Sequence, residues 1–263
     1  MNIWEALFLG FVQGATEFLP VSSSGHLVAG QALLGLEIPG IRFEVAVHLA
    51  TLISVFVIYR VRLRHLLDGI IRRDREIWRY LGLLLLATVP AGLLGVLFGN
   101  TVKSLFENPF VPATAFLVTG LILWSTRWIH REEVLKRPDV RGAILIGLAQ
   151  AFAMVPGISR SGTTVAMALW LGVAPKEAAA FSFLMSIPTI GGAALLQLSD
   201  VSSGDLSLST TALVAGSVVA AVTGMGAIRA FVLVLARQTF HHFGVYCWVL
   251  GVVFLAYLLV SVS

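Results

Sequence analysis

Two short polar clusters in this chain combine residue types that can bind or transfer a phosphate group. The first is "EFLPVSSSGHLV" (residues 17–28) and the second is "PGISRSG" (residues 156–162). In each cluster, proline and glycine interrupt an apolar run, and serines stand where a new helix can begin. Serines at a helix start cap some backbone N–H groups and leave others free, and these free donors attract anions. Two such helix starts predict a phosphate-binding site.

Arg160, inside the second cluster, carries the positive charge that such a site needs. A guanidinium at the centre of a lipid-exposed helix costs at least about 2.5–3.5 kcal/mol, so Arg160 is expected to have an anionic partner. A bound phosphate is one such partner. The other is Glu17 in the first cluster, with which Arg160 would form a structural salt bridge. The residues alone leave both interpretations open.

The composition indicates that these clusters lie in a membrane protein. Hydrophobic residues make up 57% of the 263 residues, charged residues make up 12%, and the mean hydropathy is +0.90. These values exclude a soluble globule, and the alternation of an outer-membrane barrel is absent. The N-terminal run lacks the basic flank of a signal peptide and is expected to stay in the mature protein. One cysteine excludes an internal disulfide, and the formal charge of +4 does not indicate nucleic-acid binding.

Eight apolar runs define the expected helices: 3–35, 43–60, 80–99, 109–127, 142–172, 177–198, 210–228 and 242–262. Six of them have about the 20 residues that cross a bilayer, whereas the first and the fifth are split by the polar clusters. The arms 142–155 and 162–172 would give roughly 21 and 16 Å of helix against about 30 Å of hydrocarbon. We therefore expect an all-α polytopic membrane protein with six transmembrane helices and two re-entrant helical hairpins.

The two broken runs also resemble each other, which predicts an internal repeat. Five residues recur 137 positions later: Gly10, Gln13, Ser22, Ser24 and Gly25 match Gly147, Gln150, Ser159, Ser161 and Gly162. One hairpin and three spans per half make an odd number of crossings, so the second half should have inverted topology. We expect one membrane domain, 1–263, with repeat 1 at about 1–130 and repeat 2 at about 138–263. The alternative is eight plain spans, two of them kinked.

The distribution of basic residues predicts the orientation. The arginine-rich segments 60–79 and 127–141 are expected to be cytoplasmic loops, and the segments 99–109 and 199–210 are expected outside. This assignment places both termini outside, opens the first hairpin outward and opens the second inward. The polar turns of the two hairpins should then meet near the centre of the bundle.

The two clusters belong to longer motifs that support a family assignment. "QGATEFLPVSSSGH" (13–26) and "PGISRSGTT" (156–164) resemble the signature motifs of the undecaprenyl-pyrophosphate phosphatase family associated with bacitracin resistance. The resemblance extends over the chain in length, motif spacing and hydropathy. It implies an integral membrane phosphatase that hydrolyses undecaprenyl pyrophosphate to the monophosphate and phosphate, recycling the lipid carrier for peptidoglycan synthesis. It also implies a bacterial inner (plasma) membrane location, a polyisoprenyl pyrophosphate substrate among membrane lipids and, as one option, a homodimer. The charge bias of the loops adds the expectation that the site opens to the outer side.

The resemblance implies the site residues as well. It points to Glu17, Ser23, His26 and Arg160 as the residues expected in catalysis. Because a pyrophosphate would be repelled by a bare Glu17 carboxylate, we expect a divalent cation, Mg²⁺ or Ca²⁺, held by Glu17 and Gln13. Gln13 stands where many members have glutamate, and this removes one charge from such a metal site. The implied substrate-binding residues are Gln13, Ser22, Ser24, Gly25, Gly157, Ser159, Ser161 and Thr164.

Chemistry gives these residues roles with open alternatives. Ser23 is the expected nucleophile and His26 its proton acceptor, or else water attacks phosphorus directly. Glu17 would hold the metal or act as the base. Arg160 and the helix N–H groups would hold the phosphoryl oxygens. His48, in the second run, is expected to be a packed hydrogen-bonding residue.

A flippase for polyprenyl phosphate is the alternative function. Inverted repeats with helices broken near mid-membrane are also typical of secondary transporters. A transporter would use Arg160 and the two helix starts, but it has no need of a Ser-x-x-His pair beside an acid. The sequence therefore favours the enzyme.

Overall fold

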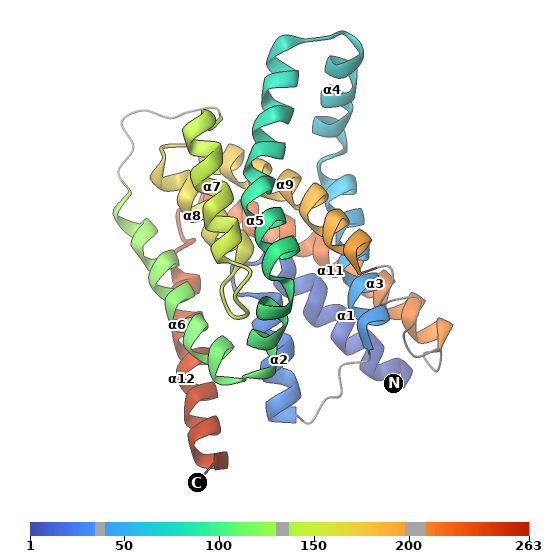
Figure 1. Ribbon diagram of the computed structural model, residues 1–263, viewed down its shortest axis with the longest axis vertical. Coiled ribbons are helices and arrows are strands. Elements are labelled where there is room, and N and C mark those ends of the chain that lie inside the picture. Colours follow the sequence, from blue (N-terminus) through green and yellow to red (C-terminus); the bar gives the residue numbers. More distant parts are fainter. Residues whose placement is uncertain (35–39, 130–136, 198–208, 263) are drawn as a thin grey trace.

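A computed structural model describes the chain except for residues 35–39, 130–136, 198–208 and 263. The described residues form helices and turns, with no strand among them (Figure 1). In chain order the helices are α1 (Ile3–Phe18), α2 (Ser23–Leu34), α3 (Gly40–Ile58), α4 (Arg60–Ile71), α5 (Arg75–Glu107), α6 (Phe110–Ser125), the short 3₁₀ helix η1 (Thr126–Trp128), α7 (Val140–Phe152), α8 (Arg160–Trp170), α9 (Pro175–Leu196), α11 (Thr210–Ala236) and α12 (His242–Val262).

Five helices are long and apolar enough to cross a membrane: α5, α6 continued by η1, α9, α11 and α12. A sixth span is obtained when α3 and α4, which are bent by 78° relative to each other, are taken together. The chain is therefore a polytopic helical membrane protein, which confirms the fold class expected from the composition.

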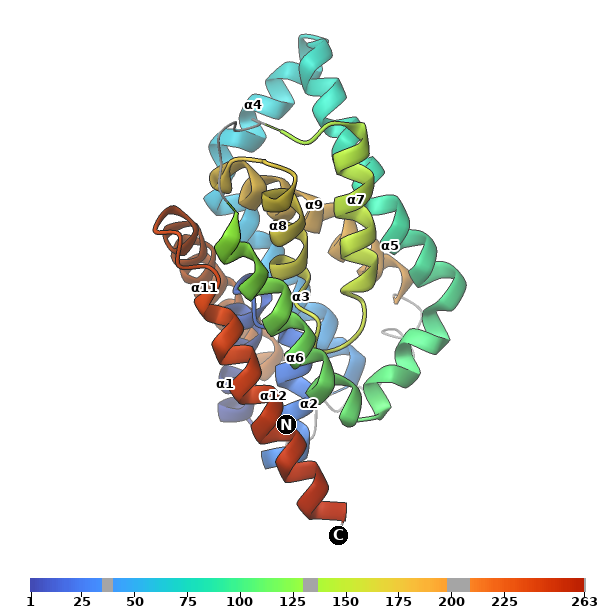
Figure 2. The same cartoon turned by 90° about the vertical axis from the view of Figure 1, so that its left-hand side faces the viewer.

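The two broken runs form helical hairpins, as predicted. Helices α1 and α2 flank residues 19–22, and helices α7 and α8 flank residues 153–159. The longest of these four arms has 16 residues, too few to cross about 30 Å of hydrocarbon. Figures 1 and 2 show the first hairpin approaching the middle of the molecule from the end that carries the C-terminus. The second hairpin approaches from the opposite end.

The helices pair in the way that two related halves would. Helix α1 packs along α11, helix α7 packs along α5, and α6 packs along α12. Matched glycines lie at the first two contacts, since a Cβ on Gly10 would stand 2.3 Å from the Gly216 carbonyl oxygen and one on Gly147 would stand 2.6 Å from that of Ala87. Small residues let membrane helices approach this closely. The boundaries of the two repeats stay a prediction.

Two expected loops are largely helical. At the outer loop expected over 99–109, α5 continues as far as Glu107. The sequence predicts a loop over 60–79, whereas the structure has α4 and the first turn of α5 there. Leu66 of α4 and Ile77 of α5 are buried in the same core, so the alternation of arginines with apolar residues marks an amphipathic helix. Helix α5 is also longer than the apolar run 80–99, because its polar first turn is capped by Asp74. Most of the expected outer loop 199–210 lies outside the described residues.

Candidate active site

The first hairpin turns at a strained serine. Ser22 has a backbone φ of 65°, a left-handed conformation that is uncommon for residues other than glycine. Its Oγ accepts a hydrogen bond from the Gly25 N–H at 3.3 Å. Its carbonyl oxygen accepts two more, from the His26 N–H at 3.2 Å and from the ring Nδ1 of His26 at 2.8 Å. These bonds hold the turn that begins α2.

The second hairpin has a similar cap and support from a third helix. Ser159 Oγ accepts a hydrogen bond from the Gly162 N–H at 3.1 Å. Gly157 has a φ of 93°, and a Cβ there would stand 2.5 Å from the Pro112 carbonyl oxygen. The Thr119 hydroxyl of α6 donates to the Gly157 carbonyl at 2.8 Å and accepts from the Ser159 N–H at 3.1 Å. Sequence reasoning missed Thr119, because one threonine in an apolar run gives little signal.

The two turns are in direct contact, which confirms that the hairpin tips meet. Ser161 Oγ donates to the Leu19 carbonyl oxygen at 3.1 Å. A Cβ on Gly25 would stand 2.9 Å from Gly157 Cα, so these two glycines allow the backbones to approach each other. The helix starts of α2 and α8 are therefore brought to one place.

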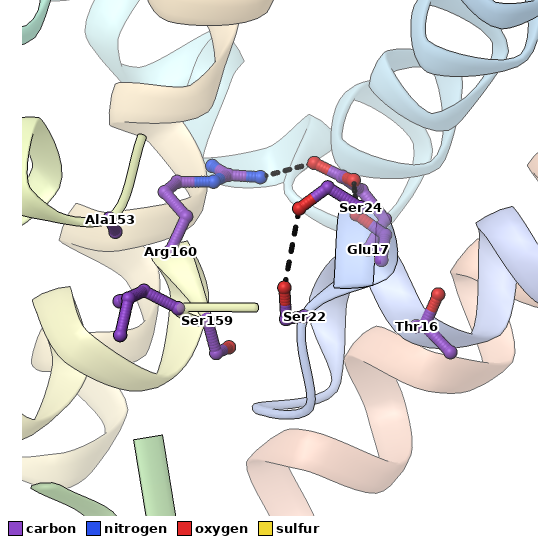
Figure 3. Close-up of a pocket in the computed structure, with 9 residues that line it drawn as sticks. Thr16, Glu17, Ser22, Ser24, Ala153, Ser159 and Arg160 are labelled. Atoms are coloured by element: carbon purple, nitrogen blue, oxygen red, sulfur yellow. Dashed lines mark hydrogen bonds and ion pairs between the residues drawn. The ribbon is translucent and has the colours of Figure 1, made fainter. Parts of the chain in front are cut away.

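Glu17, near the end of α1, is the centre of the contact. Its Oε1 accepts a hydrogen bond from Arg160 Nη2 at 2.6 Å, so the expected salt bridge is present (Figure 3). Its Oε2 accepts from Ser23 Oγ at 2.7 Å and from Gln13 Nε2 at 3.0 Å. The Nε2 atom of His48 lies 3.8 Å from the same oxygen. The Glu17 side chain is only 7% exposed, so these polar neighbours replace its hydration.

A cleft of about 60 Å³ opens beside this ion pair, enough for about two water molecules. Both hairpins line it, with Thr16, Glu17, Ser22, Ser23, Ser24, Ala153, Ile158, Ser159 and Arg160 (Figure 3). Every polar residue in this lining except Thr16 is a predicted site residue. The cleft therefore coincides with the site that the motifs indicate.

Several predicted substrate-binding residues support the cleft without lining it. The glycines Gly25 and Gly157 provide the close approach of the turns. The Thr164 hydroxyl donates to the Arg160 carbonyl at 2.8 Å and lies 2.7 Å from Ser182 Oγ. Thr164 is thus a packing residue between α8 and α9, because its hydroxyl is already engaged there.

His26 does not contact Ser23 in this structure. Its Nδ1 is bonded to the Ser22 carbonyl, and its Nε2 lies 2.7 Å from the hydroxyl of Tyr246 on α12. Ser23 Oγ is directed to Glu17 instead. The contact that a proton transfer from Ser23 to His26 would need is therefore absent, and the titratable group in hydrogen-bond contact with Ser23 is Glu17. Tyr246 was missed as well, because 220 residues separate it from His26 in the sequence.

Two buried polar atoms at the site have no hydrogen-bond partner within the described ranges: Arg160 Nη1 and Gln13 Oε1. An unpaired buried polar group costs about 1–3 kcal/mol, so a ligand that reached either atom would remove this cost. Arg160 Nη1 is a donor suited to an anionic oxygen, and Gln13 Oε1 is an acceptor suited to a cation. The described residues contain no group of three or more His, Cys, Asp or Glu side chains that could hold a metal ion.

The chain is similar to known proteins over nearly its whole length. The family described as "Bacitracin resistance protein BacA" matches residues 6–253. An undecaprenyl-diphosphatase of Elusimicrobium minutum is 40% identical over 255 residues, which cover 96% of this chain and 97% of that protein. An undecaprenyl-diphosphatase of Alcanivorax borkumensis is 42% identical over 264 residues, covering 98% of this chain and 100% of that protein. A third, from Halothermothrix orenii, is 37% identical over 254 residues, covering 96% of each.

Proposed function

This chain belongs to the bacitracin resistance protein BacA family, and from that membership we propose that it is an undecaprenyl-diphosphatase embedded in a membrane. It hydrolyses undecaprenyl diphosphate to undecaprenyl monophosphate and inorganic phosphate. The names of the relatives support a phosphatase over a flippase. The monophosphate product would return as the lipid carrier of peptidoglycan precursors.

The observation that carries this proposal is that a candidate nucleophile, a candidate base and an anion-binding arginine lie together at one cleft. Ser23 Oγ is hydrogen-bonded to Glu17, and Glu17 is hydrogen-bonded to Arg160. Arg160 Nη1 has no partner within the described part of the chain, so it can donate a hydrogen bond to a phosphoryl oxygen. The free N–H groups at the starts of α2 and α8 would add donors for the same anion.

In the first step, Ser23 attacks the terminal phosphorus and Glu17 takes the serine proton. The bond from Ser23 Oγ to phosphorus forms, and the bond from phosphorus to the bridging oxygen breaks. The electron pair leaves with undecaprenyl monophosphate, which receives the proton from Glu17. Arg160 and the helix N–H groups hold the phosphoryl oxygens while their charge shifts.

In the second step, water attacks the phosphoserine. Glu17 takes a proton from that water, and the bond between phosphorus and Ser23 Oγ breaks. Inorganic phosphate leaves, and Ser23 recovers its proton from Glu17. Direct attack of water on the pyrophosphate would need the same base and the same anion-binding groups, with Ser23 serving as a ligand only.

A divalent cation, Mg²⁺ or Ca²⁺, is the proposed cofactor. The donor set fits a hard cation, because Gln13 Oε1 is buried without a partner among the described residues and Glu17 supplies carboxylate oxygens beside it. Gln13 and Glu17 would hold the ion, with water and substrate oxygens completing its coordination. When bound, it would reduce the repulsion between the pyrophosphate and Glu17.

The proposed location is the inner (plasma) membrane of a bacterium, with the cleft reached from the outer side. The arginine-rich α4 and the start of α5 lie at the end of the molecule opposite to the C-terminus (Figure 1). Arginine-rich segments favour the cytoplasmic side. The first hairpin, with Glu17 and Ser23, would then enter from the outer leaflet.

Phosphate release by the purified protein in detergent tests the function. Undecaprenyl diphosphate should release phosphate without any bilayer, whereas a flippase needs one to act. Release should stop in EDTA and return with Mg²⁺ or Ca²⁺. No release with either cation would contradict the phosphatase, and release unaffected by EDTA would contradict the cofactor alone.

A further inference from the structure

We propose that Tyr246 of α12 is a positioning residue that acts through His26 on the strained turn presenting Ser23. This inference rests on the proposed phosphatase function and adds a residue to it. Its starting point is the 2.7 Å contact between the Tyr246 hydroxyl and His26 Nε2. The contact connects the last helix of the chain to the first hairpin.

The hydrogen bonds set the direction of this interaction. A backbone carbonyl only accepts, so the Nδ1 atom of His26 that contacts the Ser22 carbonyl must carry a proton. In a neutral imidazole, Nε2 is then unprotonated and accepts the proton of the Tyr246 hydroxyl. Tyr246 therefore favours the tautomer in which His26 holds Ser22.

The hydrogen bond from the His26 ring to the Ser22 carbonyl also affects the position of Ser23, the next residue. Ser22 keeps a φ of 65°, a conformation that persists only when its surroundings enforce it. The His26 ring supplies the shorter of the two bonds to the Ser22 carbonyl, 2.8 Å against 3.2 Å for the backbone bond. A ring that rotates away would release the turn and move Ser23 Oγ from Glu17. A displacement of about 1 Å at a reacting group can lower the rate about a hundredfold.

The surroundings indicate positioning rather than substrate contact. The His26 ring lies parallel to the Tyr246 ring, with centroids 5.8 Å and planes 3° apart, and it meets the edge of Phe116 at 5.5 Å. Neither His26 nor Tyr246 lines the cleft that holds Glu17 and Arg160. Tyr246 therefore acts on the reaction only through the histidine.

The first test replaces Tyr246 by phenylalanine, which removes the hydroxyl and keeps the stacked ring. We expect kcat to fall about fivefold, the worth of one neutral hydrogen bond, with KM within about twofold of wild type. Tyr257→Phe is the matched control, because the Tyr257 hydroxyl also joins α12 to α2, at the Ala32 carbonyl 2.9 Å away, but farther from the turn. The control should keep the wild-type kcat.

Three kinetic outcomes would overturn the proposal. An unchanged kcat in Tyr246→Phe would show that Tyr246 has no effect on the reaction. An equal loss of kcat in Tyr257→Phe would show that the Tyr246 hydroxyl only stabilises the packing of α12 against α2. A change in KM alone would indicate direct substrate contact.

A double-mutant cycle tests whether Tyr246 acts through His26. In a His26→Gln background, Tyr246→Phe should cause no further loss beyond about twofold, because the group it acts on is already gone. Additive losses would contradict the proposal.

A measurement without substrate separates this inference from the proposed function. In protein labelled with ¹⁵N-histidine, the ring signals of His26 are identified by their loss in His26→Gln. They should move in Tyr246→Phe and stay in place in Tyr257→Phe. Signals unmoved in Tyr246→Phe would overturn the inference even in an active enzyme, whereas wild-type protein that releases no phosphate would overturn the function alone.

Discussion

The two hairpins share a frame and differ in chemistry. Both begin their second helix with a serine whose Oγ accepts an N–H three residues on, at 3.3 Å for Ser22 and 3.1 Å for Ser159. In both, that hydroxyl also lies 3.3 Å from the hydroxyl two residues later, Ser24 or Ser161. The capping hydrogen bonds are thus the same in both, although the backbone φ is 65° at Ser22 and −74° at Ser159.

The side chains at matched positions carry different functions. At the spacing of 137 residues, Glu17 corresponds to Met154, Ser23 to Arg160 and His26 to Thr163. The first hairpin therefore supplies the carboxylate and the hydroxyl, whereas the second supplies the cation. A nucleophile and an anion-binding group need different charges, and two inverted hairpins bring them together from opposite sides.

The matched glutamines, Gln13 and Gln150, make different hydrogen bonds because their neighbours differ. Gln13 donates to Glu17, and its Oε1 is left without a partner in the described part of the chain. Gln150 has Met154 where Gln13 has Glu17. Its Oε1 accepts a hydrogen bond from the Thr189 hydroxyl at 3.2 Å, and its Nε2 has no hydrogen-bond partner among the described residues. Only the first of the two is placed to act on the reaction.

The comparison of the two hairpins would be wrong altogether if both entered the membrane from the same side. In a Cys247→Ser background, a cysteine at Asn2, beside the start of α1, should react fully with an impermeant thiol reagent added outside intact cells. A cysteine at Arg141, at the start of α7, should react only after the cells are opened. Both residues are exposed, and each lies at the open end of one hairpin. Equal labelling from outside would contradict the inverted arrangement.

The nucleophile gives the largest expected kinetic effect. Ser23→Ala should lower kcat on the order of 10⁴-fold or more at every cation concentration, because no ion replaces a missing nucleophile. Ser24→Ala, which removes the neighbouring hydroxyl, should lose far less. Substantial turnover in Ser23→Ala would indicate direct attack by water.

Replacement of Glu17 is expected to give the second largest loss of kcat. Glu17→Gln is expected to lower kcat about 10³-fold, because an amide cannot take the serine proton. Met154→Gln puts the same amide at the matched position of the second hairpin, where no chemistry is expected, and should change kcat less than about threefold. Recovery of Glu17→Gln by excess Mg²⁺ or Ca²⁺ would leave Glu17 with metal binding alone and would remove it from proton transfer.

Replacement of Arg160, the charged residue of the second hairpin, is expected to give the next largest loss of activity. Arg160→Lys should lower kcat/KM about 10²-fold, because an ammonium cannot bond Glu17 and a phosphoryl oxygen through a planar fork. Size-exclusion and thermal unfolding profiles in detergent should match the wild type, as the charge is kept. Near-normal turnover would remove Arg160 from phosphate binding.

The glutamines give the smallest effect and the most direct comparison. Gln13→Leu should lower kcat about tenfold, because it removes a hydrogen bond to a charged group. Gln150→Leu should leave kcat unchanged within about twofold. A similar loss in both variants would indicate that each glutamine only supports its hairpin.

The features that depend on local chemistry can be predicted from the order of the residues alone. Apolar runs of spanning length fix an all-α membrane protein, and proline, glycine and serine fix where two of the runs break, because these effects act within a few residues. An arginine among apolar residues requires an anion, so Glu17 and a phosphate were the expected partners of Arg160. Segment 60–79 shows the limit of this reasoning: its arginines suggested a loop, and burial of Leu66 against α5 makes it a helix.

Which side chains meet depends on how helices that are distant in the sequence pack together. The spacing of Ser23 and His26 allows a contact on one helix face, but the imidazole turns to the Ser22 carbonyl and to Tyr246. Ser23 Oγ is left with Glu17 as its hydrogen-bond partner. Side-chain rotation at a fixed backbone is set by neighbours from other helices, which lie far away in the sequence. For that reason the motifs predict where the site lies, and the contact of α12 with the first hairpin determines which of its groups meet.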